Sequence, residues 1–83
     1  MSRIIGTTGN HELSDIVETK GGKLYVVDSL LTSDRGYETM VFKYNKGKRR
    51  ITNWADLYCR RYTSEEDMLK THQRICQNLE KLI

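Results

Sequence analysis

The fold of this chain is decided by Tyr37-Glu38-Thr39-Met40-Val41-Phe42-Lys43-Tyr44, together with the later run Thr63-Ser64-Glu65-Glu66. The first stretch is rich in β-branched and aromatic residues, which favour a strand. Side chains alternate between the two faces of a strand, so Met40, Phe42 and Tyr44 share one face. We expect that face to meet the core.

The second stretch predicts the start of a helix. Thr63 and Glu66 have the spacing of a capping box, and Glu65, Glu66 and Asp67 would lie at the positive end of the helix dipole. Apolar and weakly polar residues then recur at steps of three and four and predict one buried stripe on a helix of about five turns. The stripe comprises Met68, His72, Ile75, Leu79 and Leu82, joined by Leu69, Cys76 and Ile83.

The predicted fold is a single small α+β domain over residues 1–83. Leu24-Tyr25-Val26-Val27 pairs with residues 37–44 through the turn 32–36, and a third strand follows. We expect a small, mainly antiparallel sheet of about three strands whose Leu24, Met40 and Phe42 face packs against the C-terminal helix. Trp54 and Leu57 are expected to close the end of that interface.

Residues 1–22 give weaker signals and are expected to be irregular with short elements. Ile4 and Ile5 are suited to start an edge strand. Leu13, Ile16 and Val17 have helical spacing over about one turn, and Gly21-Gly22 ends that segment.

Composition excludes several classes of protein. With 83 residues, 37% hydrophobic and 30% charged, the chain has the composition of one ordinary globular domain, without an apolar run long enough for a transmembrane helix or a signal peptide. We therefore expect a cytoplasmic protein of a bacterial host cell with no membrane contact. Cys59 and Cys76 are expected to be free, buried thiols, because cytosolic reductants keep such pairs open.

No catalytic set can be singled out by spacing. A Cys59 nucleophile with His72 as base is conceivable, but a thiol beside Leu57 in a core-facing run would be inert. We expect no enzyme and no catalytic residue.

Metal binding is weighed in the same way. His72 and Cys76 lie four residues apart on one helix face, and Cys59 and His11 would complete four zinc-type donors. Structural zinc sites use closely spaced cysteine pairs, which this chain lacks, so we expect neither a metal site nor a cofactor.

Positive charge is concentrated in the second half of the chain. Between Lys43 and Arg61 there are seven positive residues and one acid, a local net charge of +6, whereas the first 42 residues carry a net charge of −2. The candidate binding residues are Lys43, Lys46, Lys48, Arg49, Arg50, Arg60 and Arg61.

The strand, the Trp segment and the helix together resemble a family. Glu38–Phe42, Trp54-x-x-Leu57, Arg61-Tyr62, and the helix opening Ser64-Glu65-Glu66 with His72 resemble small bacteriophage and prophage proteins of uncharacterised function. The resemblance covers a little under half of the chain and implies a phage or prophage setting. Relatives often carry acidic residues where this chain has Lys46, Lys48, Arg49 and Arg50, so the identity of a partner does not carry over.

Two functions are therefore expected as alternatives. The first is a non-catalytic accessory protein that binds a protein partner, either a bacterial defence enzyme or a phage complex. The second is sequence-independent nucleic-acid binding through the basic hairpin 43–50 with Arg60 and Arg61. The exposed edges of a small sheet also leave pairing with a second copy open.

Overall fold

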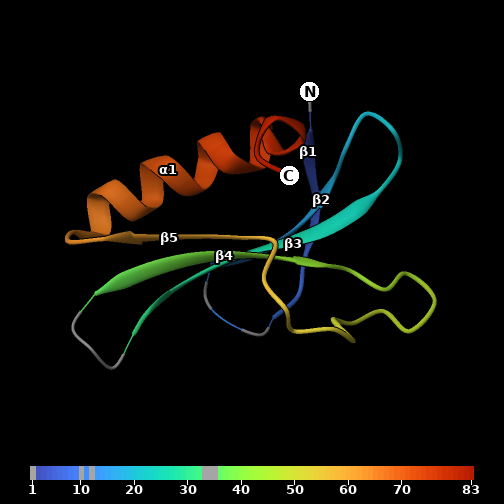
Figure 1. The fold of residues 1–83 in the computed structure, drawn as a ribbon, viewed down its shortest axis with the longest axis horizontal. Helices are drawn as coiled ribbons and strands as arrows, with labels where there is room; N and C mark the ends of the chain where they lie inside the picture. Colours follow the sequence, from blue (N-terminus) through green and yellow to red (C-terminus); the bar gives the residue numbers. More distant parts are fainter. Residues whose placement is uncertain (1, 10, 12, 33–35) are drawn as a thin grey trace.

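The computed structural model describes residues 2–9, 11, 13–32 and 36–83, and it is α+β. Five antiparallel strands form a sheet in sequence order: β1 (Arg3–Thr7), β2 (Leu13–Glu18), β3 (Leu24–Leu31), β4 (Tyr37–Lys43) and β5 (Tyr58–Tyr62). One helix, α1 (Glu65–Gln77), crosses one face of this sheet and is followed by a 3₁₀ turn, η1 (Leu79–Lys81) (Figure 1). No helix among the described residues is long and apolar enough to span a membrane.

The sheet contains more strands than the sequence predicted. Ile4 and Ile5 lie in edge strand β1, as expected, but the segment with helical spacing forms strand β2 instead. Its pairing with β3 explains the outcome, because Val17 opposite Tyr25 is buried in the core whereas one helical turn alone would not be stable. The central residues of the predicted turn 32–36 lie outside the described residues.

The helix packs on the face opposite to the predicted one. Val17, Val27 and Val41 face α1 and form a core with Ile75, Cys76 and Leu79. Val26 and Phe42 lie on the other face, which we call the outer face, and pack there with Ile51. Both faces of β4 carry apolar side chains, so alternation alone did not decide which face the helix covers.

Local signals explain the bounds of α1. Ser64 is the N-cap, and its hydroxyl accepts a hydrogen bond from the Asp67 N–H, so the helix cap lies one residue after the predicted Thr63. Met68, His72, Ile75 and Cys76 are its buried residues, whereas Leu69 is exposed. The helix ends at Gln77, short of the expected five turns, and Leu82 and Ile83 are exposed beyond η1.

The N-terminal segment is fixed to the end of the helix. The Ser2 hydroxyl donates to the Cys76 carbonyl at 2.6 Å and accepts from the Leu79 N–H at 2.9 Å. The Ser2 N–H also donates to the Gln77 carbonyl at 3.2 Å. These bonds satisfy backbone groups at the helix C-terminus that would otherwise lack partners.

Candidate functional site: a basic loop and a buried polar cluster

The basic loop, residues 44–57, connects β4 to β5 and extends beyond one end of the sheet (Figure 1). Asn45 and Arg50 form a two-way backbone bridge, and the Asn45 side chain accepts from the Lys48 N–H at 2.9 Å. Arg49 has a φ of 55°, the left-handed backbone that completes this tight turn. The turn is therefore ordered by its own bonds, and Lys46, Lys48, Arg49 and Arg50 project from it exposed.

The second half of the basic loop presents Trp54. Ile51 is buried and anchors the loop on the outer face beside Phe42, and the Trp54 ring meets Phe42 edge-on with centroids 5.2 Å apart. Trp54 is nevertheless 58% exposed and Leu57 is 42% exposed. The expectation that these two residues close the sheet–helix interface is wrong, because α1 lies on the other face of the sheet.

The predicted basic residues do not form one patch. Lys43 is the last residue of β4 and the loop cations follow it, whereas Arg60 and Arg61 belong to β5. Arg61 forms an ion pair with Glu38 at 3.0 Å on the outer face. Arg60 lies on the helix side with its guanidinium 5.6 Å from the centre of the Tyr62 ring.

Arg60 and Arg61 instead border a groove between β5 and α1. The groove has a volume of about 440 Å³, and Lys70 and Arg74 border it from the helix. Lys70 is paired with Glu66 at 2.9 Å, while Arg60 and Arg74 form no ion pair among the described residues. The spacing of four residues places Lys70 and Arg74 on one helix face. That they lie beside β5 could not be predicted from the sequence, because it depends on how α1 packs on the sheet.

A smaller pocket adjoins the basic loop. It has a volume of about 120 Å³, and its polar lining comes from the guanidinium-bearing Arg49 and Arg50, from Tyr44, and from Thr7 and Thr8 of the β1 end. Two cations and hydroxyl groups around so small a space are the chemistry that binds a phosphate or carboxylate group.

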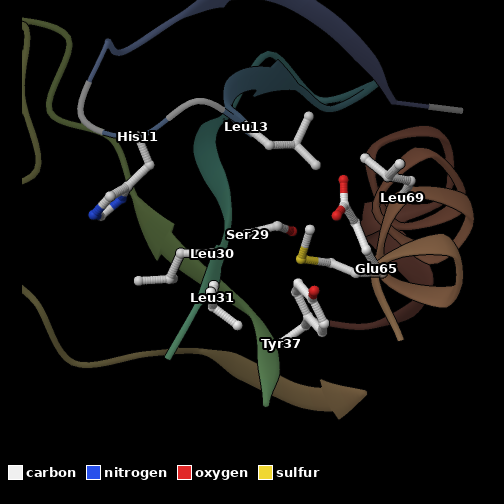
Figure 2. Close-up of a pocket in the computed structure, with 9 residues that line it drawn as sticks. His11, Leu13, Ser29, Leu30, Leu31, Tyr37, Glu65 and Leu69 are labelled. Atoms are coloured by element: carbon white, nitrogen blue, oxygen red, sulfur yellow. The ribbon is translucent and has the colours of Figure 1, made fainter. Parts of the chain in front are cut away.

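A larger cavity lies at the other end of the sheet, between β3 and the start of α1. It has a volume of about 750 Å³, and Leu13, Ser29, Glu65 and Leu69 line a common space there (Figure 2). His11 also lines it, and its Nδ1 lies 2.9 Å from both carboxylate oxygens of Asp28. The lining is mainly apolar and is separate from the basic loop.

A chain of buried polar side chains connects the sheet to the helix. His72 Nε2 lies 2.7 Å from Asp15 Oδ2, and His72 Nδ1 lies 2.6 Å from Ser29 Oγ. Ser29 Oγ is in turn 2.5 Å from Thr39 Oγ1. His72 is 0% exposed, and Ser29 and Asp15 are 2% and 8% exposed.

This chain contains the residue types of a hydrolase triad in a different geometry. In a triad the serine hydroxyl meets Nε2 and the carboxylate meets Nδ1, whereas here the two nitrogens have exchanged partners. Ser29 is 2% exposed, and it also lines the cavity between β3 and the start of α1. The cluster joins α1 to the sheet, because His72 of the helix is hydrogen-bonded to Asp15 of β2 and to Ser29 of β3.

The two cysteines lie in different environments. Cys76 is buried as expected, and desolvation followed by the charge of Asp15 raises the pKa of its thiol to about 12. Cys59 is exposed on the outer face, opposite Met40, contrary to the expectation of a buried thiol. Desolvation and then Glu38 raise the pKa of Cys59 as well, and His72 lies on the other face, so these two residues do not form a nucleophile–base pair.

The zinc donors weighed from the sequence are not brought together. Cys59 is on the outer face and His11 is bonded to Asp28, while His72 and Cys76 lie in the core. A different third donor, Asp15 of β2, joins His72 and Cys76. Sequence reasoning missed Asp15 because it is 57 positions from His72 and lies in a segment with helical spacing.

Comparisons with protein-family models, with curated proteins and with solved structures found no match to this chain. The resemblance to small phage and prophage proteins therefore stays a prediction.

Proposed function

We propose that this chain is a non-catalytic accessory protein that binds an acidic surface of a protein partner through its basic loop. The observation that carries the proposal is the exposure of Trp54 and Leu57 beside the cations of one ordered turn. Trp and Arg are the residue types most enriched at the energetic centres of protein interfaces. Charge complementarity with an acidic partner would also accelerate association.

The geometry of Trp54 supports this use. The ring is held by Phe42 and the loop is anchored by buried Ile51, so little conformational entropy would be lost when a partner covers the exposed part of the ring. An exposed Trp whose position is fixed in advance is therefore suited to fill a pocket on a partner.

The setting we propose is the one that the family resemblance implies, a phage or prophage protein acting in a bacterial host. The partner would be a bacterial defence enzyme or a component of a phage complex. The reversed order of partners on His72 supports a role without catalysis.

The test uses two loop variants and a charge-matched control. Trp54→Ala removes the ring, and Lys48→Glu/Arg49→Glu/Arg50→Glu reverses the turn. Each should weaken partner binding at least ~30-fold, the effect of losing about 2 kcal/mol, because interface energy is concentrated in a few residues. The control Lys70→Glu/Arg74→Glu/Lys81→Glu makes the same charge change on α1 and η1 and should bind within about threefold of wild type.

All altered side chains in these variants are exposed, so each chain should stay folded, although the control loses the Lys70–Glu66 pair and Trp54→Ala loses the ring contact with Phe42. Equal affinity of the wild type and both loop variants would overturn the assignment of the basic loop.

A second function is favoured by the small pocket beside Arg49 and Arg50. The pocket is also lined by Ile51, which packs with Phe42, the contact of the exposed Trp54 ring. Cations combined with an aromatic ring are the means by which proteins bind single strands without reading sequence. This alternative predicts that the affinity for a single-stranded oligonucleotide falls steeply with salt, with a logarithmic slope of about −0.7 per phosphate contacted. A flat salt dependence would exclude it.

A further inference from the structure

Three side chains that meet under α1 carry different metal-binding donor atoms. Asp15 projects from β2, and His72 and Cys76 project one turn apart from α1. A carboxylate oxygen, an imidazole nitrogen and the thiol sulfur lie within 4.8 Å of one another, and all three residues are buried. We propose that Asp15, His72 and Cys76 form a binding site for a divalent transition-metal ion, with Zn²⁺ as the ion that the donor set fits best.

The choice of ion follows from the donors. Zinc binds carboxylate oxygen, imidazole nitrogen and thiolate sulfur, whereas magnesium and calcium bind oxygen and do not select sulfur. Tetrahedral zinc holds neighbouring donor atoms roughly 3.3–3.7 Å apart. The 2.7 Å contact between His72 and Asp15 would have to open by roughly 0.6–1.0 Å, which a small side-chain rotation provides.

The surroundings of His72 match those of a metal ligand. Its Nδ1 is bonded to Ser29, whose hydroxyl is bonded to Thr39, so the ring is oriented with Nε2 toward Asp15. Histidines that bind metals through one nitrogen almost always have the other nitrogen fixed by such a hydrogen bond. Ser29 and Thr39 would accordingly be positioning residues.

Charge balance supports a divalent ion in so buried a place. The Asp15 carboxylate and a Cys76 thiolate together neutralise a 2+ ion, and neutral His72 adds no charge, so the loaded site is uncharged inside the core. The hydrogen bond between Asp15 and His72 does not involve the Cys76 thiol. In a metal site, Cys76 would be the third ligand. Water or the second Asp15 oxygen would complete the coordination.

Such a site would serve structure, because it joins β2 to α1 within the core and no ligand is open to substrate. It lies on the helix side of the sheet, whereas the basic loop packs on the outer face. The inference does not depend on the function proposed for that loop.

The test is titration of the chelator-treated full chain with Co²⁺, whose bond to a thiolate gives a charge-transfer absorption band. The experiment uses Cys59→Ser as its background, because replacing this exposed residue leaves Cys76 as the single thiol of the chain. We expect one equivalent of Co²⁺, a thiolate band in wild type and in Cys59→Ser, displacement by Zn²⁺, and a higher melting temperature with either ion.

Cys76→Ser should abolish the band and weaken Zn²⁺ binding at least ~10-fold. If this core variant does not fold, the band in Cys59→Ser still assigns the ligand. Absence of the band in Cys59→Ser at stoichiometric protein concentration would overturn the proposal. So would a Zn²⁺ affinity in folded Cys76→Ser equal to that of wild type.

Discussion

Tyr62 places a hydroxyl group in the core between β5 and α1, where it has no hydrogen-bond partner among the described residues. Removing this oxygen therefore loses no hydrogen bond of good geometry, although the hydroxyls of Thr39 and Thr71 lie near it. We expect Tyr62→Phe to keep the free energy of unfolding or to raise it by about 1 kcal/mol, as measured by urea denaturation. A loss greater than about 1 kcal/mol would show that the hydroxyl is bonded in solution.

The same side chain makes stability depend on alkaline pH. Desolvation raises the pKa of Tyr62 above its ordinary value of 10.0, and the nearby Thr39, Arg60 and Thr71 only partly oppose this. Below pH 10.0 the phenol is neutral in both the folded and the unfolded chain. As pH rises from there to the raised pKa, the unfolded chain ionises first, so this contribution to stability is lost.

Urea midpoints measured across this alkaline range test the prediction. The midpoint of wild type should fall more steeply than that of Tyr62→Phe, because the two proteins differ only in this phenol. Parallel curves would contradict a raised pKa at Tyr62.

His72 is the residue on which the buried polar cluster depends. In chelator-containing buffer, His72→Ala should lower the free energy of unfolding by about 3–5 kcal/mol, because it leaves the Asp15 carboxylate buried without its partner. Asp15→Asn keeps an acceptor for the imidazole and should cost less. A smaller loss for His72→Ala than for Asp15→Asn would contradict this view of the cluster.

At the scale of elements, the start of α1 offers two adjacent candidates for the N-cap, Thr63 and Ser64, which two substitutions distinguish. Ser64→Ala removes the bond from the Asp67 N–H and should lower the free energy of unfolding by about 1 kcal/mol. The matched control Thr63→Ala changes an exposed residue outside the cap and should cost little. Thermal unfolding of the pair checks both values, and the reverse order would place the cap at Thr63.

The strands were predicted only in part from the sequence. The strand over residues 37–44 was correctly predicted, and its alternation put Met40 and Phe42 on one face, but that face meets Ile51 of the basic loop instead of the helix. Both faces of β4 are covered, and the covering of the outer face depends on the path of residues 44–57. Periodicity within one strand contains no information about that path.

The candidate sites were predicted in the same uneven way. Charge density along the chain identified the basic loop, because those cations are adjacent in sequence. Exposure of Trp54 was missed, since a lone Trp in a small chain is ordinarily expected in the core. Asp15 was missed because a buried acid can be predicted only when its partner is known, and its partner, His72, lies far along the chain on α1.

At the scale of the whole molecule, the two faces of the sheet differ in use. The helix side holds the core and the polar cluster that joins α1 to the sheet, and the outer face supports the basic loop at one end (Figure 1). Fixing the helix on one face leaves the other free to position Trp54 beside the cations. We propose that this loop is the binding surface for a protein partner.

The most direct measurement is affinity capture from bacterial lysate, run with and without nuclease. It compares the tagged wild type with Trp54→Ala, with the reversed turn Lys48→Glu/Arg49→Glu/Arg50→Glu, and with the α1 and η1 control Lys70→Glu/Arg74→Glu/Lys81→Glu. We predict one stoichiometric protein captured by wild type and control and lost from both loop variants. Capture of the same protein by all four chains, or recovery that disappears with nuclease, would contradict the account.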